Sequence, residues 1–271
     1  MTHPRIVFDH VSVQFPGDRG PTSVVDDVSY AINDREFVSV IGPSGCGKTT
    51  MMNIVAGFMQ PSSGTVTLDG QTITGPGPDR GVIFQEYGIF PWLTVKENIA
   101  FGLRLAANRT EAGAREDICQ RYMRLMGLAD FADAWPRMLS GGMRQRLALA
   151  RAYAVKPQFL LMDEPFGALD AQTREVMHDL ILHVFKLEKA TIVFVTHDVE
   201  EAIYLGQRIV LLAPRPGRID TIYKVPFTGP RHQELKHTRE FLDMKREILE
   251  RIRETSGMKT DTDLLDQMSA G

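Results

Sequence analysis

The stretch GPSGCGKT, from Gly42 to Thr49, constrains this chain more than any other part of it. It matches the pattern G-x-x-x-x-G-K-[ST], it follows the apolar run FVSVI, and good helix formers come after it. Glycines allow the backbone bends that turn successive N–H groups inward, and N–H groups that converge at a helix start bind phosphate. The context predicts a strand, a tight loop and a helix from Lys48 to about Phe58.

Each residue type in this loop suits a bound nucleotide. Lys48 is placed to reach the β- and γ-phosphates as a compact cation, and Thr49 to place its hydroxyl on Mg²⁺. The rest of the loop supplies mostly backbone groups. The competing interpretation is a glycine-rich turn with a chance lysine. We assign nucleotide binding to Gly42, Pro43, Ser44, Gly45, Cys46, Gly47, Lys48, Thr49 and Thr50.

Two adjacent carboxylates, Asp163 and Glu164, end the buried-strand pattern FLLMDEP. Such a pair is costly at the end of an apolar strand unless a cation or hydrogen bonds satisfy it. We expect Asp163 to hold Mg²⁺ and Glu164, on the opposite side of the pleat, to polarise the attacking water as general base. The alternative is a pair of exposed carboxylates without a role.

A second flexible start precedes a helical run in LSGGMRQR, from Leu139 to Arg146. Because bare N–H groups at a helix N-terminus bind anions, Ser140, Gly141 and Gly142 are a second candidate phosphate site. The competing interpretation is a helix cap before Met143. Two such sites in one chain need an explanation.

Patterning divides the chain into three parts. The first third reads as short strands, and from Gln158 onward strand and helix alternate, with apolar runs such as TIVFVT that are typical of a buried parallel sheet. In the middle, Ile118, Tyr122, Leu125 and Met126 share a helical face. We therefore expect an α/β domain over residues 1–228, with an inserted helical subdomain at about 87–157.

A C-terminal segment, 229–271, follows the α/β domain. It is expected to form an amphipathic helix over about Pro230 to Thr255 and a loose tail from Ser256. The helix would place its apolar residues on one face: Phe241, Leu242, Ile248, Leu249 and Ile252.

Composition favours a globular chain with no strong charge bias. Hydrophobic residues make up 43%, and 31 basic residues nearly balance 34 acidic ones, which argues against bulk binding to nucleic acid. No apolar run approaches the length of a spanning helix, and the N-terminus lacks the apolar core of a signal peptide. The two cysteines, Cys46 and Cys119, are expected to be reduced thiols.

Six motifs occur in a fixed order: the phosphate loop, Gln85 in VIFQ, LSGGMRQR, LLMDEP, GALD and VTHD. In this order they resemble the nucleotide-binding subunit of an ATP-binding-cassette (ABC) transporter, over about Ile6 to Pro226. The resemblance implies a P-loop NTPase cassette. Its fold is α/β, a mostly parallel core sheet with an antiparallel β subdomain and an inserted helical subdomain.

The resemblance also answers why one chain has two phosphate-binding helix starts. In this family two cassettes pair head to tail, so Ser140, Gly141 and Gly142 would bind the γ-phosphate of ATP held by the partner's loop. Two positive helix ends would then share one anion, and closure would exclude water.

Further roles are implied by the same resemblance. Gln85 would touch Mg²⁺ and the attacking water, His197 would contact the γ-phosphate, and Asp170 would lie at the dimer interface. Phe15 would stack on the adenine, although Phe8 in that place, or core packing of Phe15, is an alternative. Lys48, Gln85, Glu164 and His197 are the catalytic set, with Thr49, Gln85 and Asp163 around Mg²⁺. Met143 stands in place of the commoner Gln, a departure that we attribute to the subgroup. Gly167 stands where Ser often starts the interface loop, and it is still small.

The region from Glu86 to Leu93 is where the family receives the membrane permease. An apolar cluster in it, which is typical of a contact surface, consists of Ile89, Phe90, Pro91 and Trp92, although Phe90 and Trp92 could instead cover the helical subdomain. FPWLTV, MRQR and GPRH resemble the nitrate/sulfonate/taurine branch of importers. This implies a cassette at the cytoplasmic face of the membrane, held by the permease and served indirectly by a solute-binding protein.

Three other functions compete with import. An exporter ATPase is disfavoured by the apolar IFPWL loop and by the absence of a fused membrane domain. A soluble ABC ATPase acting on nucleic acid or ribosomes usually carries two cassettes or a long coiled coil. A nucleotide-sensing scaffold would be expected to lack Glu164 or His197, and both are present.

Overall fold

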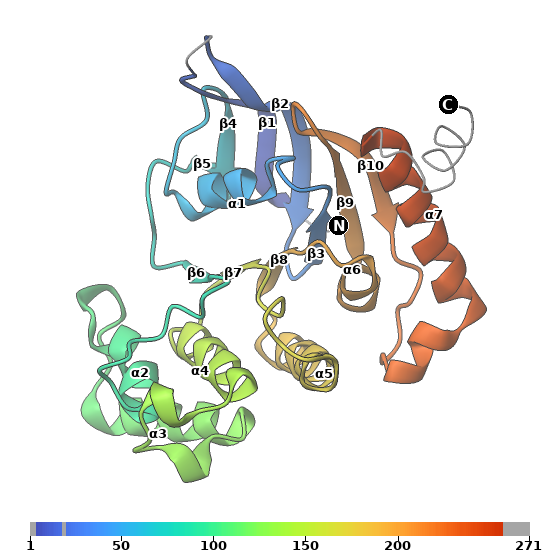
Figure 1. Ribbon diagram of the computed structural model, residues 1–271. Helices are drawn as coiled ribbons and strands as arrows, with labels where there is room; N and C mark the ends of the chain where they lie inside the picture. Colours follow the sequence, from blue (N-terminus) through green and yellow to red (C-terminus); the bar gives the residue numbers. More distant parts are fainter. Residues whose placement is uncertain (1–3, 18–19, 257–271) are drawn as a thin grey trace.

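The computed structural model describes residues 4–17 and 20–256 (Figure 1), so the expected tail lies, after Ser256, outside the described residues. The strands are β1 (Pro4–Phe15), β2 (Thr22–Asn33), β3 (Phe37–Ile41), β4 (Ser63–Leu68), β5 (Gln71–Thr72), β6 (Arg80–Ile83), β7 (Phe159–Asp163), β8 (Thr191–Val195), β9 (Arg208–Ala213) and β10 (Arg218–Lys224). The α-helices are α1 (Lys48–Ala56), α2 (Val95–Phe101), α3 (Ala112–Leu125), α4 (Gly141–Ala154), α5 (Ala171–Glu188), α6 (Val199–Leu205) and α7 (Arg239–Ser256). Short 3₁₀ turns span Gly102–Arg104, Ala106–Asn108, Ala129–Phe131, Pro136–Met138 and Gln233–His237.

The strands form two sheets. A six-stranded sheet has the order β10-β9-β3-β8-β7-β6, in which all neighbours are parallel except the edge strand β10. A second, antiparallel sheet has the order β2-β1-β4-β5. The predicted fold class, a mostly parallel core sheet with an antiparallel β subdomain, is confirmed.

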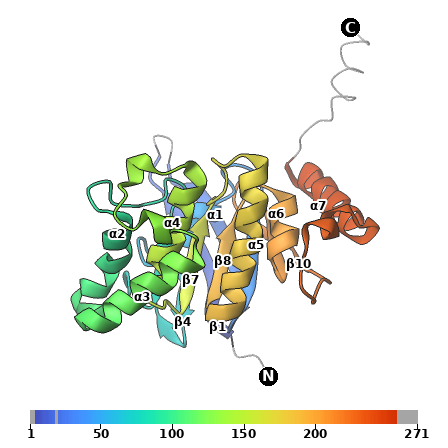
Figure 2. The same ribbon diagram turned by 90° about the horizontal axis from the view of Figure 1, so that it is seen from below.

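Alternation along the central strands explains why helices cover both faces of the six-stranded sheet. In β3 every residue is buried; Phe37 and Ile41 face one core, whereas Val38 and Val40 face the other. The core on one face contains α1 and the antiparallel sheet, and the core on the opposite face contains residues of α2 to α7. Figures 1 and 2 show this division, with α1 beside the antiparallel strands and α4 and α5 on the other side. Parallel sheets are stable only when covered in this way.

The helices α2, α3 and α4 lie between β6 and β7 in the chain and group together in space (Figure 1). On α3, Tyr122 is buried and the following Met126 is buried too, whereas Ile118 and Leu125 are only half-buried. The helix predicted to end near Phe58 ends at Ala56, because Gly57 takes the left-handed conformation and caps it.

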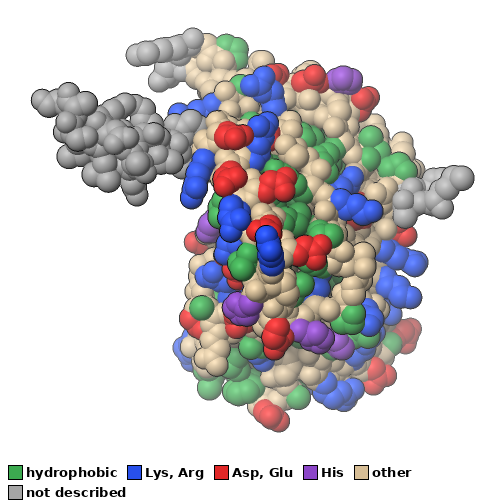
Figure 3. Space-filling model, turned by 90° about the vertical axis from the view of Figure 1, so that its right-hand side faces the viewer, with side chains coloured by type: hydrophobic (Ala, Val, Ile, Leu, Met, Phe, Trp, Pro, Cys, Tyr) green, Lys and Arg blue, Asp and Glu red, His purple; other side chains and the backbone are tan. Residues whose placement is uncertain are grey.

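The C-terminal helix differs from its prediction. It begins at Arg239 rather than near Pro230, after the 3₁₀ turn, and the Thr238 hydroxyl accepts a 3.4 Å hydrogen bond from Phe241 N–H at its start. Phe241 and Ile248, two turns apart, are buried, but Leu242 is 45% exposed because it lies one residue around the helix. The outer face that α7 presents carries interspersed positive and negative side chains (Figure 3).

Candidate functional site

The phosphate-type loop joins β3 to α1 as the sequence predicts. Gly47 precedes the helix with φ of 89°, and a Cβ there would lie 2.7 Å from Val25 Cγ2, so the position accepts only glycine without a shift. No side chain caps α1. The N–H groups of its first turn therefore remain available to an anion.

The loop folds around the Lys48 side chain. Its Nζ donates to the carbonyl oxygens of Gly42 at 2.8 Å and Pro43 at 3.2 Å, and the residue is only 8% exposed. Cys46 is buried beside it, and burial raises the pKa of the thiol. The thiol is thus held neutral. Cys46 and Cys119 are both free, as expected.

Thr49 and Asp163 meet across the loop and the end of β7. The Thr49 hydroxyl donates to Asp163 Oδ2 at 3.0 Å. Burial raises the pKa of Asp163, against the hydrogen bond from Thr49, so this carboxylate gains from a nearby cation. The described residues hold no cluster of three or more His, Cys, Asp or Glu side chains suited to a metal. A hydroxyl and one carboxylate fit Mg²⁺, which keeps several waters and takes few protein ligands beside a phosphate.

Glu164 corrects one prediction. We expected its direction from the alternation of a strand, but β7 ends at Asp163 and Glu164 has a left-handed backbone with φ of 44°. Its N–H donates to the carbonyl of Val195 at 2.9 Å, which holds the turn in place. This turn, rather than the pleat, aims the carboxylate, and its Oε2 lies 3.1 Å from His197 Nδ1.

Glu164 and His197 thus form a pair at the ends of neighbouring strands β7 and β8. His197 is 65% exposed in its side chain and Glu164 24%. A part-buried carboxylate can take a proton from water, and the imidazole beside it can stabilise the carboxylate in its position. This is the chemistry of a general base.

At the second helix start Ser140 is exposed, Gly141 is half-buried and Gly142 is buried. Ser140 precedes α4, and its hydroxyl accepts a 3.3 Å hydrogen bond from Met143 N–H. A Cβ on Gly142 would lie 2.6 Å from Thr173 Cγ2, so this glycine also lets α4 approach α5 closely. Ser140 therefore acts as a cap, and its exposure leaves it accessible to a second molecule.

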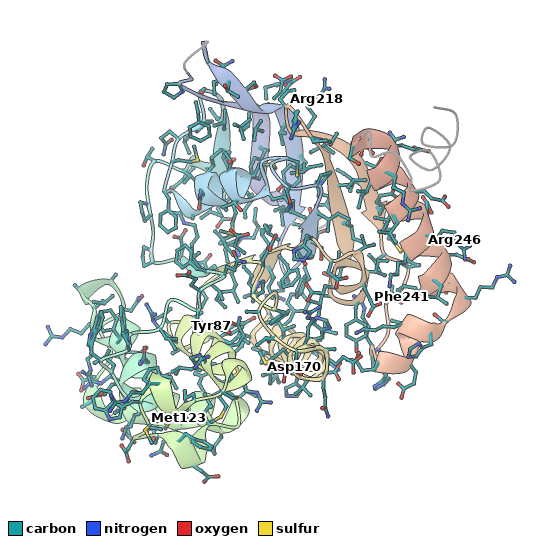
Figure 4. The ribbon with its side chains drawn as sticks, viewed as in Figure 1. Tyr87, Met123, Asp170, Arg218, Phe241 and Arg246 are labelled. Carbon is teal, nitrogen blue, oxygen red and sulfur yellow. The ribbon has the colours of Figure 1, made fainter. Side chains whose placement is uncertain are left out.

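The start of α5 lies beside that of α4. Asp170 caps α5 because its carboxylate accepts a 2.9 Å hydrogen bond from Thr173 N–H. This hydrogen bond lowers the pKa of the exposed carboxyl. Figure 4 shows Asp170 at this end of α5 and Tyr87 beside α4. The Arg144 guanidinium lies 5.7 Å from the centroid of the Tyr87 ring. Residues from two of the predicted motifs, LSGGMRQR and GALD, thus meet a residue of the Glu86–Leu93 segment near the two helix starts.

Gln85 lies two residues beyond β6, in an exposed turn at the junction with the helical region. Beyond it, Phe90 packs against Phe101 with ring centroids 4.4 Å apart, whereas Trp92 is 66% exposed. Each of the two interpretations of this cluster therefore fits one of its aromatic residues. Phe90 covers the helices, and Trp92 projects outward.

Asn98 is a residue whose importance the sequence alone did not reveal. It is fully buried on α2; its side-chain oxygen accepts 2.8 Å from Phe90 N–H, and its amide nitrogen donates to backbone carbonyls of the same loop, including those of Phe90 and Leu93. The signal available in the sequence was a polar residue, Asn98, eight positions after the apolar Phe90. Asn98 gives the Glu86–Leu93 segment its shape.

Phe15 ends β1 and is 42% exposed, where it lines a surface pocket with Pro16, Gly17 and Ser62. Phe8, the alternative aromatic, is buried and stacks on Tyr30 with centroids 4.5 Å apart. Of the two, Phe15 is the one that a planar ligand could reach.

Comparison with known proteins shows which family the chain belongs to. The family model described as ABC transporter matches residues 25–167. The chain belongs to the ABC transporter family. This membership, together with the cassette fold, makes it an ABC ATPase.

Relatives in the ABC transporter family match most of the chain. A putative ATP-binding protein of Brucella abortus is 49% identical over 246 residues, covering 90% of this chain and 92% of that protein. The nitrate import ATP-binding protein of Synechocystis is 44% identical, covering 83% and 86%. The taurine import ATP-binding protein of Pelagibacter ubique is 42% identical, covering 91% and 94%.

Solved ABC cassettes share the fold. A dimeric cassette in a post-hydrolysis state bound to ADP and Pi has a TM-score of 0.71 at 29% identity, covering 82% of this chain and 99% of that one. A dimeric bacterial ABC transporter cassette has a TM-score of 0.72 at 30% identity with the same coverage. Among the described helices of the present cassette, none is long and apolar enough to cross a membrane.

Proposed function

We propose that this chain is the ATP-hydrolysing subunit of an importer and powers solute uptake through a separate membrane permease. The observation that carries the hydrolytic part is the juxtaposition of two pairs, Thr49 with Asp163 and Glu164 with His197. Support for import comes from the relatives named as nitrate and taurine import proteins. The solutes that fit this branch are small and often anionic.

The residues divide the chemistry among them. The backbone N–H groups from Ser44 to Thr50 and the Lys48 ammonium would hold the phosphates. Thr49, Asp163 and Gln85 would hold Mg²⁺, which would supply positive charge beside the phosphate oxygens. Glu164 takes a proton from the attacking water. His197 steadies Glu164 and donates to the γ-phosphate. Phe15 stacks on the adenine.

The complete site belongs to two copies of the chain. Because α1 and α4 pack on opposite faces of the six-stranded sheet, the two helix starts of one chain do not converge on one nucleotide. Head-to-tail pairing brings Ser140, Gly141 and Gly142 of one copy over the nucleotide of the other, with Asp170 at the interface. The dimeric relatives of known structure support this arrangement.

The permease docks on the segment from Glu86 to Leu93, with Trp92 as the exposed apolar contact. We further propose that the cassette spans residues 1–228, with its helical subdomain at about 87–157, and that 229–271 form a C-terminal extension. Through the permease the subunit lies at the cytoplasmic face of the membrane. A solute-binding protein delivers the solute to the same permease.

Identification of membrane partners tests this proposal. A tagged Glu164→Gln chain, purified with ATP from gently solubilised membranes, is expected to bring a polytopic permease with it. The matched control adds Trp92→Ala, which should lose the permease while still pairing with its own kind. Ribosomal or nucleic-acid partners without a membrane protein would overturn the transport function, and efflux by the reconstituted complex would overturn its direction.

A further inference from the structure

A buried carboxylate, Glu201 on α6, joins two parts of the site that are far apart in the chain. The residue is 4% exposed. Its Oε2 accepts a 2.6 Å hydrogen bond from the Thr196 hydroxyl, and its Oε1 lies 3.3 Å from His178 Nε2. Since a carboxylate only accepts, His178 carries its proton on Nε2.

One side of this cluster fixes the backbone on both sides of His197. The Thr196 hydroxyl that donates to Glu201 also accepts 3.0 Å from Asp198 N–H. Thr196 N–H donates to the carbonyl of Val40, within β3. The exposed His197 side chain therefore stands on a backbone clamped through Glu201.

The other side of the cluster reaches the loop that carries Asp170. Arg174 donates to the carbonyl of Leu169 at 3.0 Å, and its guanidinium lies 3.7 Å from both Glu201 and Asp198. His178, one turn further along α5, packs edge-on against Phe166 of the same loop, with ring centroids 5.4 Å apart. A shift of the start of α5 moves Arg174 and His178 together.

Charge holds the cluster together. Burial acts to raise the pKa of Glu201, but the hydrogen bonds from His178 and Thr196 and the charge of Arg174 outweigh it, so the pKa lies below its ordinary value. Glu201 is thus an ionised carboxylate in a buried position, and removing its charge takes a counter-charge away from Arg174.

We propose that Glu201 is a positioning residue that couples the loop bearing Asp170 to His197. The inference rests on the proposed function, in which Asp170 meets the partner copy and His197 meets the γ-phosphate. Pairing at Asp170 moves the start of α5, Arg174 and His178 carry the displacement to Glu201, and Thr196 passes it to the backbone of His197. One cassette thereby senses that its partner is in place.

The test is ATP turnover by the purified chain. Glu201→Gln keeps the volume and an acceptor for Thr196 but removes the charge. We expect kcat to fall roughly tenfold, as for other supporting residues behind a catalytic group, with ATP affinity within about threefold of wild type. The matched control is Glu200→Gln on the same turn. Glu200 pairs with Lys245 at 2.8 Å and with the buried Lys236 at 3.3 Å rather than with Thr196 or His178, so its substitution should leave kcat unchanged.

A double-mutant cycle separates positioning from general destabilisation. In a His197→Ala background, measured with excess enzyme in single turnovers, Glu201→Gln should cost less than about twofold, because its effect passes through the missing imidazole. An equal loss in both backgrounds would overturn the coupling. If Glu201→Gln does not fold, Thr196→Val replaces it in the same cycle, with Thr196→Ser expected to restore turnover.

The outcomes also distinguish the two proposals. A wild-type chain that fails to hydrolyse ATP would refute the proposed function. If the wild-type chain hydrolyses ATP and the Glu201→Gln variant has the same kcat, only the role of Glu201 is refuted.

Discussion

At the scale of residues, the site depends on where short turns place single atoms. Motif spacing predicted that Thr49 and Asp163 belong together, and their 3.0 Å hydrogen bond joins them. The approach of Glu164 to His197 could not be predicted from spacing, because it depends on a left-handed backbone that a glutamate rarely adopts. The roles of these residues remain predictions that kinetics must test.

Glu164→Gln is expected to reduce ATP turnover by at least about a hundredfold, since it removes the general base while keeping the shape of the side chain. ATP binding should persist, and size-exclusion chromatography with ATP should show a trapped dimer. Turnover near the wild-type rate would remove Glu164 from this role.

Gly57 and Gly70 offer a matched pair for stability. Both have φ of 79°, but a Cβ on Gly57 would lie 2.1 Å from the carbonyl oxygen of Gly75, whereas a Cβ on Gly70 meets nothing within 4 Å. Gly70→Ala should cost about 1–2 kcal/mol of unfolding free energy from its backbone alone. Gly57→Ala should cost about 2 kcal/mol more through the clash. Urea unfolding measures both, and equal losses would contradict the packing argument.

At the scale of elements, burial patterns decided which parts of the fold could be predicted. β3, β7 and β8 read as continuous apolar runs because helices or strands cover both faces of their sheet. The predicted start of α7 near Pro230 was wrong, because Gln233 to His237 form a 3₁₀ turn and α7 begins only at Arg239. Periodicity alone also could not show that Leu242 lies outside the buried stripe.

The loop before α2 separates folding from docking. Asn98→Ala leaves buried backbone groups without partners and should cost about 2–3 kcal/mol of unfolding free energy. Trp92→Ala, in the same loop but exposed, should leave the unfolding midpoint unchanged while weakening permease binding. Thermal unfolding and co-purification read the two effects, and a large loss of stability in Trp92→Ala would assign that side chain to the core.

At the scale of the whole molecule, the six-stranded sheet separates the two phosphate-binding helix starts. The family resemblance predicted that two copies share their sites, and the opposite positions of α1 and α4 give that prediction a geometric reason. The sequence pattern showed both helix starts but not the sheet between them, because strand order follows from tertiary packing.

Mixing two inactive variants tests the sharing of sites. Ser140→Arg and Lys48→Ala should each inactivate their homodimers, whereas a heterodimer keeps one composite site intact and collects both lesions in the other. ATP turnover of the mixture should therefore exceed that of either parent. Activity equal to the average of the parents would mean that each chain works alone.

The left-handed backbone at Glu164 has a consequence for how this protein can evolve. Holding a non-glycine residue there costs roughly 1–2 kcal/mol, which glycine would not incur. A population selected only for resistance to heat would therefore accumulate Gly or Asn at position 164, and each such lineage would lose hydrolysis. Thermal stability and ATPase activity favour different residues at this position, so only continued selection for transport keeps the glutamate in place.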